Sequence, residues 1–164
     1  MTFQDSHLGR LRRHVGHDLL VSPGAQVLVL DERDKVLLLR RSDTGEWALP
    51  AGACEPGDSF RTSAARELAE ETGLHLDPDE LVPFASISTA RVHTIRYPNG
   101  DLVHAFALCF WARASNRTSL GGDGEGTDFT WSSLDHLAVP TFAVTAEAVR
   151  LYLRYQDTGL FQAN

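Results

Sequence analysis

The stretch that decides the fold is residues 52–74, GACEPGDSFRTSAARELAEETGL, in which a glycine-rich turn leads into a short helical pattern. Glu67, Glu70 and Glu71 have the spacing i, i+3 and i+4. On a helix, their three carboxylates therefore project from one face. Like charges at this spacing repel one another, and a divalent cation would remove that penalty because hard cations prefer oxygen ligands. The pattern predicts a metal-binding catalytic helix. The alternative is an acidic helix face that is only solvated.

The frame around these glutamates resembles the signature of the Nudix hydrolases, a family that includes MutT-like proteins. That signature runs glycine, five residues, glutamate, seven residues, arginine–glutamate, an aliphatic residue, any residue, two glutamates, any residue, glycine and an aliphatic residue. Asp58 departs from it, because the family has the longer glutamate there. The resemblance extends from about Gly24 to the Trp131 region. The positions in register are Gly52, Arg66, Glu67, Leu68, Glu70, Glu71, Gly73 and Leu74.

This resemblance implies an α/β fold, the Nudix-type α/β/α sandwich with a mixed central sheet and a catalytic loop-helix-loop. It also implies a pyrophosphohydrolase that acts on a nucleoside diphosphate linked to a group X: a nucleotide sugar, an ADP-ribose-like compound or a nucleoside triphosphate. Such chemistry needs Mg²⁺ or Mn²⁺ to bridge phosphate oxygens, and an activated water. The alternative is a nucleotide-sensing protein of the same fold without catalysis, which is favoured by Asp58 and by the lack of a clear specificity motif.

The resemblance also implies a set of metal ligands. Its ligand positions fall on Glu67, Glu70 and Glu71, with the backbone carbonyl of Gly52 as a further ligand. Glu70 and Glu71 are the firmest assignments, whereas Glu67 is either a ligand or the base that orients the water. Glu55, in the glycine-rich turn, is a candidate side-chain ligand for a second metal ion.

A supporting network is expected around the carboxylates. Arg66 should point to a different side of the helix from Glu67 and hold the carboxylate-rich loop through bidentate contacts. The resemblance favours this role for Arg66 over direct substrate contact. Asp58 belongs to the same network, although its side chain is one methylene shorter than the glutamate of the family. Gly57 shapes the turn, and Gly73 is a plausible C-terminal cap of the helix.

A further catalytic carboxylate is expected from a distant loop, because many family members use an acidic residue several positions before a Trp-containing strand. Here Glu125 precedes Trp131 inside a glycine-rich loop. Its glycine neighbours would let it swing over a bound substrate. Asp123 and Asp128 compete for this role, and the alternative is a solvated acidic loop.

Base or sugar specificity is only weakly encoded. His93 and His104 flank the turn at 98–101, where they could approach each other across two strands. The competing interpretation is that most of the candidates are ordinary strand-surface residues. The candidate contacts with substrate are Arg40, Arg41, Trp47, Arg91, His93, Tyr97 and His104.

Composition narrows the class of protein. A length of 164 residues suits a single domain over 1–164 with a hydrophobic core. The net charge of −7 disfavours non-specific binding to nucleic acid or anionic membranes, but not a small nucleotide substrate. No apolar run reaches transmembrane length, residues 1–15 lack a secretory core, and 2 cysteines are too few for a disulfide framework. We therefore expect a cytoplasmic protein, with a homodimer as one option for its N-terminal helix.

Local patterns predict the order of elements. Residues 1–20 form a helical arm with an amphipathic helix over 7–17, and residues 141–164 form a C-terminal helical segment, helical over 141–155. The metal-binding helix begins near Asp58 or Ser59, either of which can cap it. The remaining predictions are a hairpin of strands 25–30 and 36–39, a loop at 78–80, strand regions 81–97 and 102–113 around the 98–101 turn, a glycine-rich loop at 115–127 and a strand at 129–131.

Overall fold

The computed structural model describes residues 3–114, 120–121 and 126–164. Its helices are η1 (Phe3–Asp5), α1 (His7–Val15), α2 (Phe60–Thr72), η2 (Pro78–Glu80), α3 (Ala90–His93) and α4 (Ala143–Thr158). Its strands are β1 (Leu20–Leu30), β2 (Lys35–Arg41), β3 (Trp47–Ala48), β4 (Ala51–Ala53), β5 (Val82–Ile87), β6 (Thr94–Arg96), β7 (Leu102–Arg113), β8 (Gly126–Ser133) and β9 (Gln162–Ala163).

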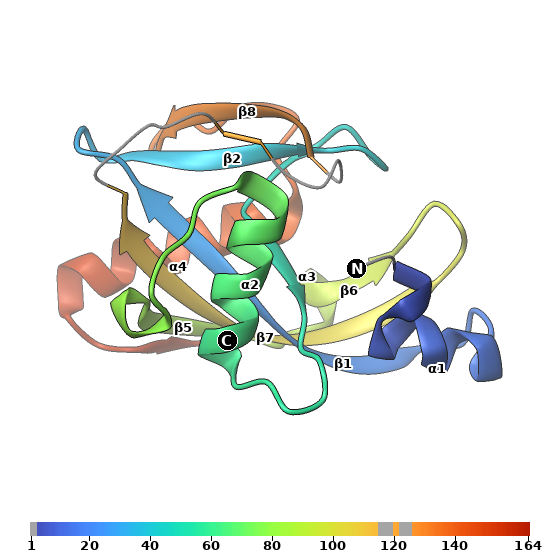
Figure 1. Ribbon diagram of the computed structural model, residues 1–164. Helices are drawn as coiled ribbons and strands as arrows, with labels where there is room; N and C mark the ends of the chain where they lie inside the picture. The colour runs from blue at the N-terminus through green and yellow to red at the C-terminus, as the bar shows by residue number, and fades with distance from the viewer. Residues whose placement is uncertain (1–2, 115–119, 122–125) are drawn as a thin grey trace.

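The strands of this described part join into one mixed sheet between α2 and α4 (Figure 1). The main path runs β3-β2-β1-β7-β5-β9, while β4 pairs with β1, β6 with β7 and β8 with β2. Strand β1 is the axis, since it runs parallel to β7 from the Leu20–Val103 pair to the Leu30–Arg113 pair. The predicted α/β/α sandwich with a mixed central sheet is confirmed.

Helix α2 covers one face of the sheet through small residues. Ala64 and Leu68 are fully buried and pack in the same cluster as Val27, Val29 and Phe110. Small side chains allow a helix to approach a sheet closely, so the backbone of α2 lies near β1 and β4. The opposite side of α2 is then free to carry polar groups at the edge of the sheet.

Helix α4 covers the other face with larger side chains. Tyr152 is buried and meets the buried Phe84 of β5 edge-on, with ring centroids 5.3 Å apart. Leu28 and Leu30 of β1 belong to the same cluster. The two faces of β1 are therefore both covered, which explains the continuous apolar run of its second half.

Both ends of α2 follow the predicted limits. The Ser59 hydroxyl accepts a hydrogen bond from the backbone N–H of Thr62, and the Thr62 hydroxyl accepts one from the N–H of Ser59. At the other end Gly73 has a left-handed φ of 75° and donates its N–H to the carbonyl of Ala69. These caps fix where the carboxylate-bearing turn of the helix begins and ends.

The prediction of one strand region over 81–97 was wrong. The segment contains β5, α3 and β6, and both strands pair with the same edge of β7. Between them the chain turns through α3, where the N–H groups of Val92 and His93 both bond the carbonyl of Thr89. β-Branched and aromatic residues at both ends of this segment favoured a strand, but local turn bonding prevailed between them.

Several predicted ends also shift. Helix α1 stops at Val15, because Gly16 takes a φ of 62°, and α4 runs from 143 to 158 before Gly159, with a φ of 67°. Residues 159–164 are therefore not helical, and β9 instead pairs in parallel with β5. The segment at 78–80 is a short 3-10 helix, and the strand expected at 129–131 is part of the longer β8. Within the described ranges no helix has both the length and the apolar character needed to cross a membrane.

Replacing Gly73 by alanine should destabilise the protein more than the matched change Gly159→Ala. Both glycines end helices with positive φ, so each substitution incurs about 1–2 kcal/mol of left-handed strain. A Cβ on Gly73 would also lie 2.4 Å from the carbonyl oxygen of Gly121, whereas one on Gly159 has no described neighbour within 4 Å. This clash should lower the free energy of unfolding of Gly73→Ala by a further amount of about 1–3 kcal/mol. Urea unfolding of both variants measures the difference, and equal losses would show that the Gly121 contact does not constrain the helix end.

Candidate active site

A cleft of about 470 Å³ opens beside the carboxylates of α2. Its walls come from the start of β1, the turn after β4, helix α2, the β6–β7 hairpin and the N-terminal arm. The predicted site residues that line it are Arg41, Gly52, Glu55, Arg66, Glu67, Glu70, Glu71, His93 and Tyr97. Arg40, Trp47, Arg91 and His104 do not line it.

The three carboxylates of α2 differ in how far they are exposed to solvent. Glu71 is only 7% exposed, and its Oε2 accepts a hydrogen bond of 2.9 Å from the N–H of Ala51. The Glu67 carboxylate lies directly against Gly52, where an added Cβ would be 2.1 Å from its Cδ. Glu70 is the most accessible, with its side chain 35% exposed. Gly52 is therefore required because the Glu67 carboxylate occupies the space that any side chain there would fill.

Arg66 binds the carboxylates instead of pointing away from them. Its Nη1 lies 2.7 Å from Glu67 Oε1 and 3.4 Å from Glu70 Oε2, so the expectation that it faces a different side from Glu67 was wrong. Its Nη2 donates to the carbonyl of Ala53 at 3.1 Å, which joins helix to loop. Burial works to lower the pKa of Arg66, but the nearby negative charges outweigh it and raise the pKa above its ordinary value.

Asp58 reaches this network despite its short side chain. Its Oδ2 lies 3.4 Å from Arg66 Nη2 and accepts a hydrogen bond of 3.0 Å from the Ser63 hydroxyl. The preceding Gly57 takes a φ of 97°, a backbone conformation that other residues rarely adopt. The glycine turn thus brings the aspartate within reach of the guanidinium.

The donor set suits a hard divalent cation in kind. It contains carboxylate oxygens and the carbonyl of Gly52, the ligands that Mg²⁺ and Mn²⁺ prefer. Over the described ranges, however, no three His, Cys, Asp or Glu side chains converge on one point as they stand. Arg66 instead supplies the positive charge for Glu67 and Glu70. A metal ion would have to take over that charge, with Glu67 and Glu70 turning from the guanidinium to the ion.

Glu55 is engaged elsewhere. Its Oε1 and Oε2 accept the N–H of His7 at 2.9 and 3.0 Å, across 48 positions of sequence. His7 is the first residue of α1. The side chain expected to bind a second metal therefore contacts the N-terminal arm in this structure.

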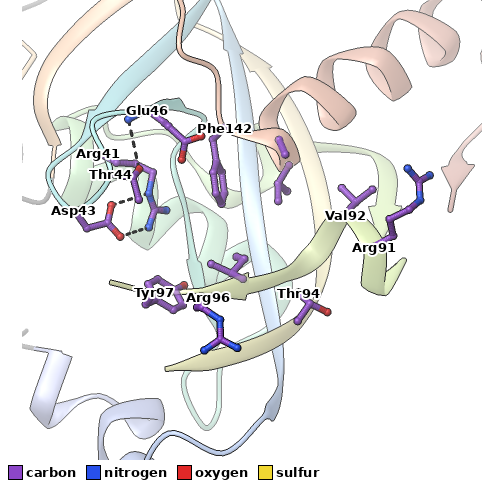
Figure 2. Close-up of a pocket in the computed structure, with 13 residues that line it drawn as sticks. Arg41, Asp43, Thr44, Glu46, Arg91, Val92, Thr94, Arg96, Tyr97 and Phe142 are labelled. Carbon is purple, nitrogen blue, oxygen red and sulfur yellow. Dashed lines mark hydrogen bonds and ion pairs between the residues drawn. The ribbon is translucent and has the colours of Figure 1, made fainter. Parts of the chain in front are cut away.

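A cationic and aromatic corner lies where the cleft meets a smaller adjoining cavity, whose lining Figure 2 shows. The Arg41 guanidinium is held by Asp43 through bonds of 2.9 and 2.5 Å. It lies 4.8 Å from the ring centroid of Phe142 and 5.8 Å from that of Tyr97. The same residues border an adjoining cavity of about 250 Å³, which Arg91 also lines. Sequence reasoning missed Phe142, because residue 142 falls within the 141–155 stretch that was predicted only as a helix.

The two histidines of the β5–β7 region bind the backbone. His93 is buried and donates Nδ1 to the carbonyl of Ile87 at 3.1 Å, and burial lowers its pKa. His104 donates Nε2 to the carbonyl of Ser88 at 2.7 Å. Thr94, not His93, lies opposite His104 in the sheet. Both rings therefore support the connection between β5 and α3.

The remaining candidates lie away from the cleft or outside the described residues. Arg40 donates Nε to the carbonyl of Gly45, and Trp47 packs against the core beneath α4. Glu125 and its competitor Asp123 lie outside the described residues. Asp128 is exposed on β8.

Comparison with known proteins places this geometry in a family. The family model described as NUDIX domain matches residues 21–153. The 8-oxo-dGDP phosphatase of Homo sapiens is 31% identical over 136 residues, which are 80% of this chain and 36% of the human protein. The nucleoside triphosphatase NudI of Salmonella newport is 30% identical over 95 residues, or 58% of this chain and 67% of that protein. The chain spans about a third of the length of the first curated relatives that it matches.

Solved structures share the fold at low identity. An ADP-ribose pyrophosphatase from Streptococcus suis has a TM-score of 0.67 at 21% identity and covers 87% of this chain and 98% of its own. The NUDIX domain of Shewanella oneidensis NrtR, complexed with ADP ribose, has a TM-score of 0.65 at 20% identity, covering 95% and 99%. Because the family model matches most of the chain and the glycine-framed glutamates stand together at one cleft, the chain belongs to the Nudix family.

Proposed function

We propose that the protein is a Nudix pyrophosphohydrolase that cleaves a pyrophosphate bond in a nucleoside diphosphate linked to a group X, using Mg²⁺ or Mn²⁺. The observation that carries the proposal is the single cleft that Glu67, Glu70 and Glu71 line together with Gly52, with the Glu67 carboxylate lying against Gly52. Family membership supports it, as do relatives that are named as a nucleoside triphosphatase and an ADP-ribose pyrophosphatase. A non-catalytic nucleotide sensor is the competing function.

Each carboxylate has a distinct part in this proposal. When bound, the metal would neutralise the charge that develops on the phosphate oxygens as the bond breaks. Glu70 and Glu71 would hold it together with the carbonyl of Gly52. Glu67, as ligand or as base, would fix the water that attacks phosphorus and would have to be ionised for either role. Glu71 is kept in place by the N–H of Ala51, so one of its oxygens has a fixed orientation.

Arg66 would position these groups without touching substrate. With its contacts to Ala53 and Asp58 it joins the glycine turn to the helix, and it keeps the like-charged carboxylates together. If a cation took over the charge of Glu67 and Glu70, the guanidinium would keep its bond to the carbonyl of Ala53. The glycine turn and the helix would then keep their relative positions through the reaction.

Arg41, Tyr97 and Phe142 would bind the nucleotide away from the metal. A guanidinium between a carboxylate and aromatic rings can contact both a phosphate and a planar base. Arg41 lines the same cleft as the carboxylates of α2. The corner would therefore hold one part of the substrate while the other lies at the metal.

The direct test is a panel of nucleotides incubated with Mg²⁺ and with Mn²⁺, with products identified by mass. The panel contains GTP, ADP-ribose and a nucleotide sugar. We expect at least one to be cleaved at a pyrophosphate bond into two phosphorylated products, and EDTA to stop the reaction. Tight binding of a panel member without turnover in either metal would overturn the proposal and support the sensor.

Glu71→Gln should lower kcat by at least about a hundredfold, because the lost charge stabilises the transition state by several kcal/mol through the metal. The glutamine can still accept the N–H of Ala51, so the fold should be retained, as circular dichroism will show. Glu147→Gln is the control, since it removes a carboxylate paired with Arg150 on α4. Equal activity of both variants would place the metal elsewhere.

Metal binding should also be visible without turnover. A ligand at about 100 times its Kd stabilises a protein by about 2.7 kcal/mol, which for a chain of this size raises Tm by about 5 °C or more. We expect this rise for the wild type in Mg²⁺ and a smaller one for Glu70→Gln, measured by calorimetry. An identical rise in both proteins would exclude Glu70 as a ligand.

A further inference from the structure

The N-terminal arm, defined as residues 3–18, forms part of the same cleft as the carboxylates of α2. Ser6, Leu8 and Arg12 line that cleft together with Glu67 and Glu70. Figure 1 shows α1 beside the β6–β7 hairpin, next to the lower end of β1. The arm is thus a wall of the site, although it precedes the matched family region of residues 21–153.

One end of the arm is bound to the glycine-rich turn after β4, which carries Glu55. The first N–H groups of a helix lack partners within the helix and carry partial positive charge. At the start of α1 the Ser6 hydroxyl accepts a hydrogen bond from the N–H of Gly9. Both oxygens of the Glu55 carboxylate accept the N–H of His7. Glu55 lies three residues after Gly52, so this contact joins the arm to the turn whose Gly52 carbonyl would bind the metal in the proposed function.

The other end is bound to the β6–β7 turn. Arg12 is 8% exposed and donates to the carbonyls of Gly16, Asp18 and Leu102. It also pairs with Asp101 at 3.6 Å. A buried guanidinium is tolerated only where carbonyls and a counter-charge surround it, so this position of Arg12 is specific.

Asp101 collects further bonds at this end. It accepts Nδ1 of His17 at 2.7 Å and Nδ2 of Asn99 at 3.0 Å. Burial tends to raise the pKa of Asp101, but these bonds and the charge of Arg12 outweigh it and hold the pKa below its ordinary value. The turn that is fixed in this way also carries Tyr97, whose N–H bonds the carbonyl of Asp101. The arm therefore restrains one side of the aromatic corner.

Apolar packing holds α1 only in part. Leu11 and Val15, two of the three large apolar side chains of α1, are each 37% exposed. The polar contacts at Glu55 and Arg12 add specific bonds at both ends of the arm to this partial packing. Loss of either should release the arm, because hydrogen bonds to charged groups are the stronger class in proteins.

We infer that Glu55 and Arg12 are positioning residues that dock the N-terminal arm as a wall of the nucleotide cleft. The inference rests on the proposed function, because the wall acts on a bound nucleotide. Undocking would weaken nucleotide binding by removing one side of the cleft and freeing the turn that carries Tyr97. It would leave the metal ligands of α2 unchanged, so KM should rise while kcat stays the same.

The test combines amide hydrogen exchange over residues 7–15 with kinetics on the panel nucleotide that the wild type cleaves. The variants are Glu55→Ala and Arg12→Ala, and the controls are Glu32→Ala, in the turn after β1, and Arg13→Ala, both at exposed residues. In the two docking variants we expect exchange to be faster, and KM higher, by about tenfold or more. The controls should match the wild type, and kcat should stay within about twofold throughout.

Conservative variants add a second readout. Glu55→Gln keeps a carbonyl acceptor for the N–H of His7 and should recover part of the exchange protection, whereas Arg12→Lys cannot reach all the carbonyls and should not. A Mn²⁺ titration separates docking from metal binding. If Glu55→Ala weakened Mn²⁺ binding and left exchange over 7–15 unchanged, Glu55 would be a metal ligand and the inference would be overturned.

Failure of the proposed function gives a different pattern. If no panel nucleotide is cleaved, the hydrolase proposal fails, and exchange with bound ADP-ribose or GTP still tests the wall. The wall predicts slower exchange over residues 7–15 when either nucleotide is bound to the wild type. Unchanged exchange in the presence of a nucleotide that binds would overturn the inference.

Discussion

The structure depends on one electrostatic arrangement, the Arg66 guanidinium among the carboxylates of α2 and the glycine turn. Three glutamates on one helical turn repel one another, and in this state Arg66 offsets that repulsion at Glu67 and Glu70. Its bond to the carbonyl of Ala53 joins the turn to the helix. Gly52 is part of the same arrangement, because only glycine leaves room for the Glu67 carboxylate.

The fold supplies the rigidity that this arrangement needs. Small residues bring α2 close to β1, and the caps at Ser59 and Gly73 fix the length of the helix. Glu71 reaches back to the N–H of Ala51, so even the strand that precedes the glycine turn is tied to the helix. The other side of the cleft is not built on one helix. Its residues Arg41, Asp43 and Phe142 come from a strand end, a turn and a helix start.

The sequence predicted the part of the site that is local, and missed the part that depends on distant contacts. The residues from Gly52 to Gly73 have a fixed spacing on one turn and one helix, so their clustering follows from helical geometry. The contact between Glu55 and His7 joins positions 48 residues apart, and no local pattern encodes it. Phe142 was missed for the same reason, because an apolar residue has the same local preference whether it faces a core or a cleft. Helix α3 was missed because local bonding to the carbonyl of Thr89 prevailed over the strand preference.

The central claim is that Glu67 and Glu70 exchange Arg66 for a divalent cation, which Glu71 also binds. The most direct measurement is the anomalous scattering of Mn²⁺ in crystals of the protein grown with the metal and ADP-ribose. The account predicts a Mn²⁺ peak bonded to oxygens of at least two of these glutamates, with Arg66 still bound to the carbonyl of Ala53. A Mn²⁺ ion bound elsewhere, with both Glu67 and Glu70 still paired to Arg66, would contradict it.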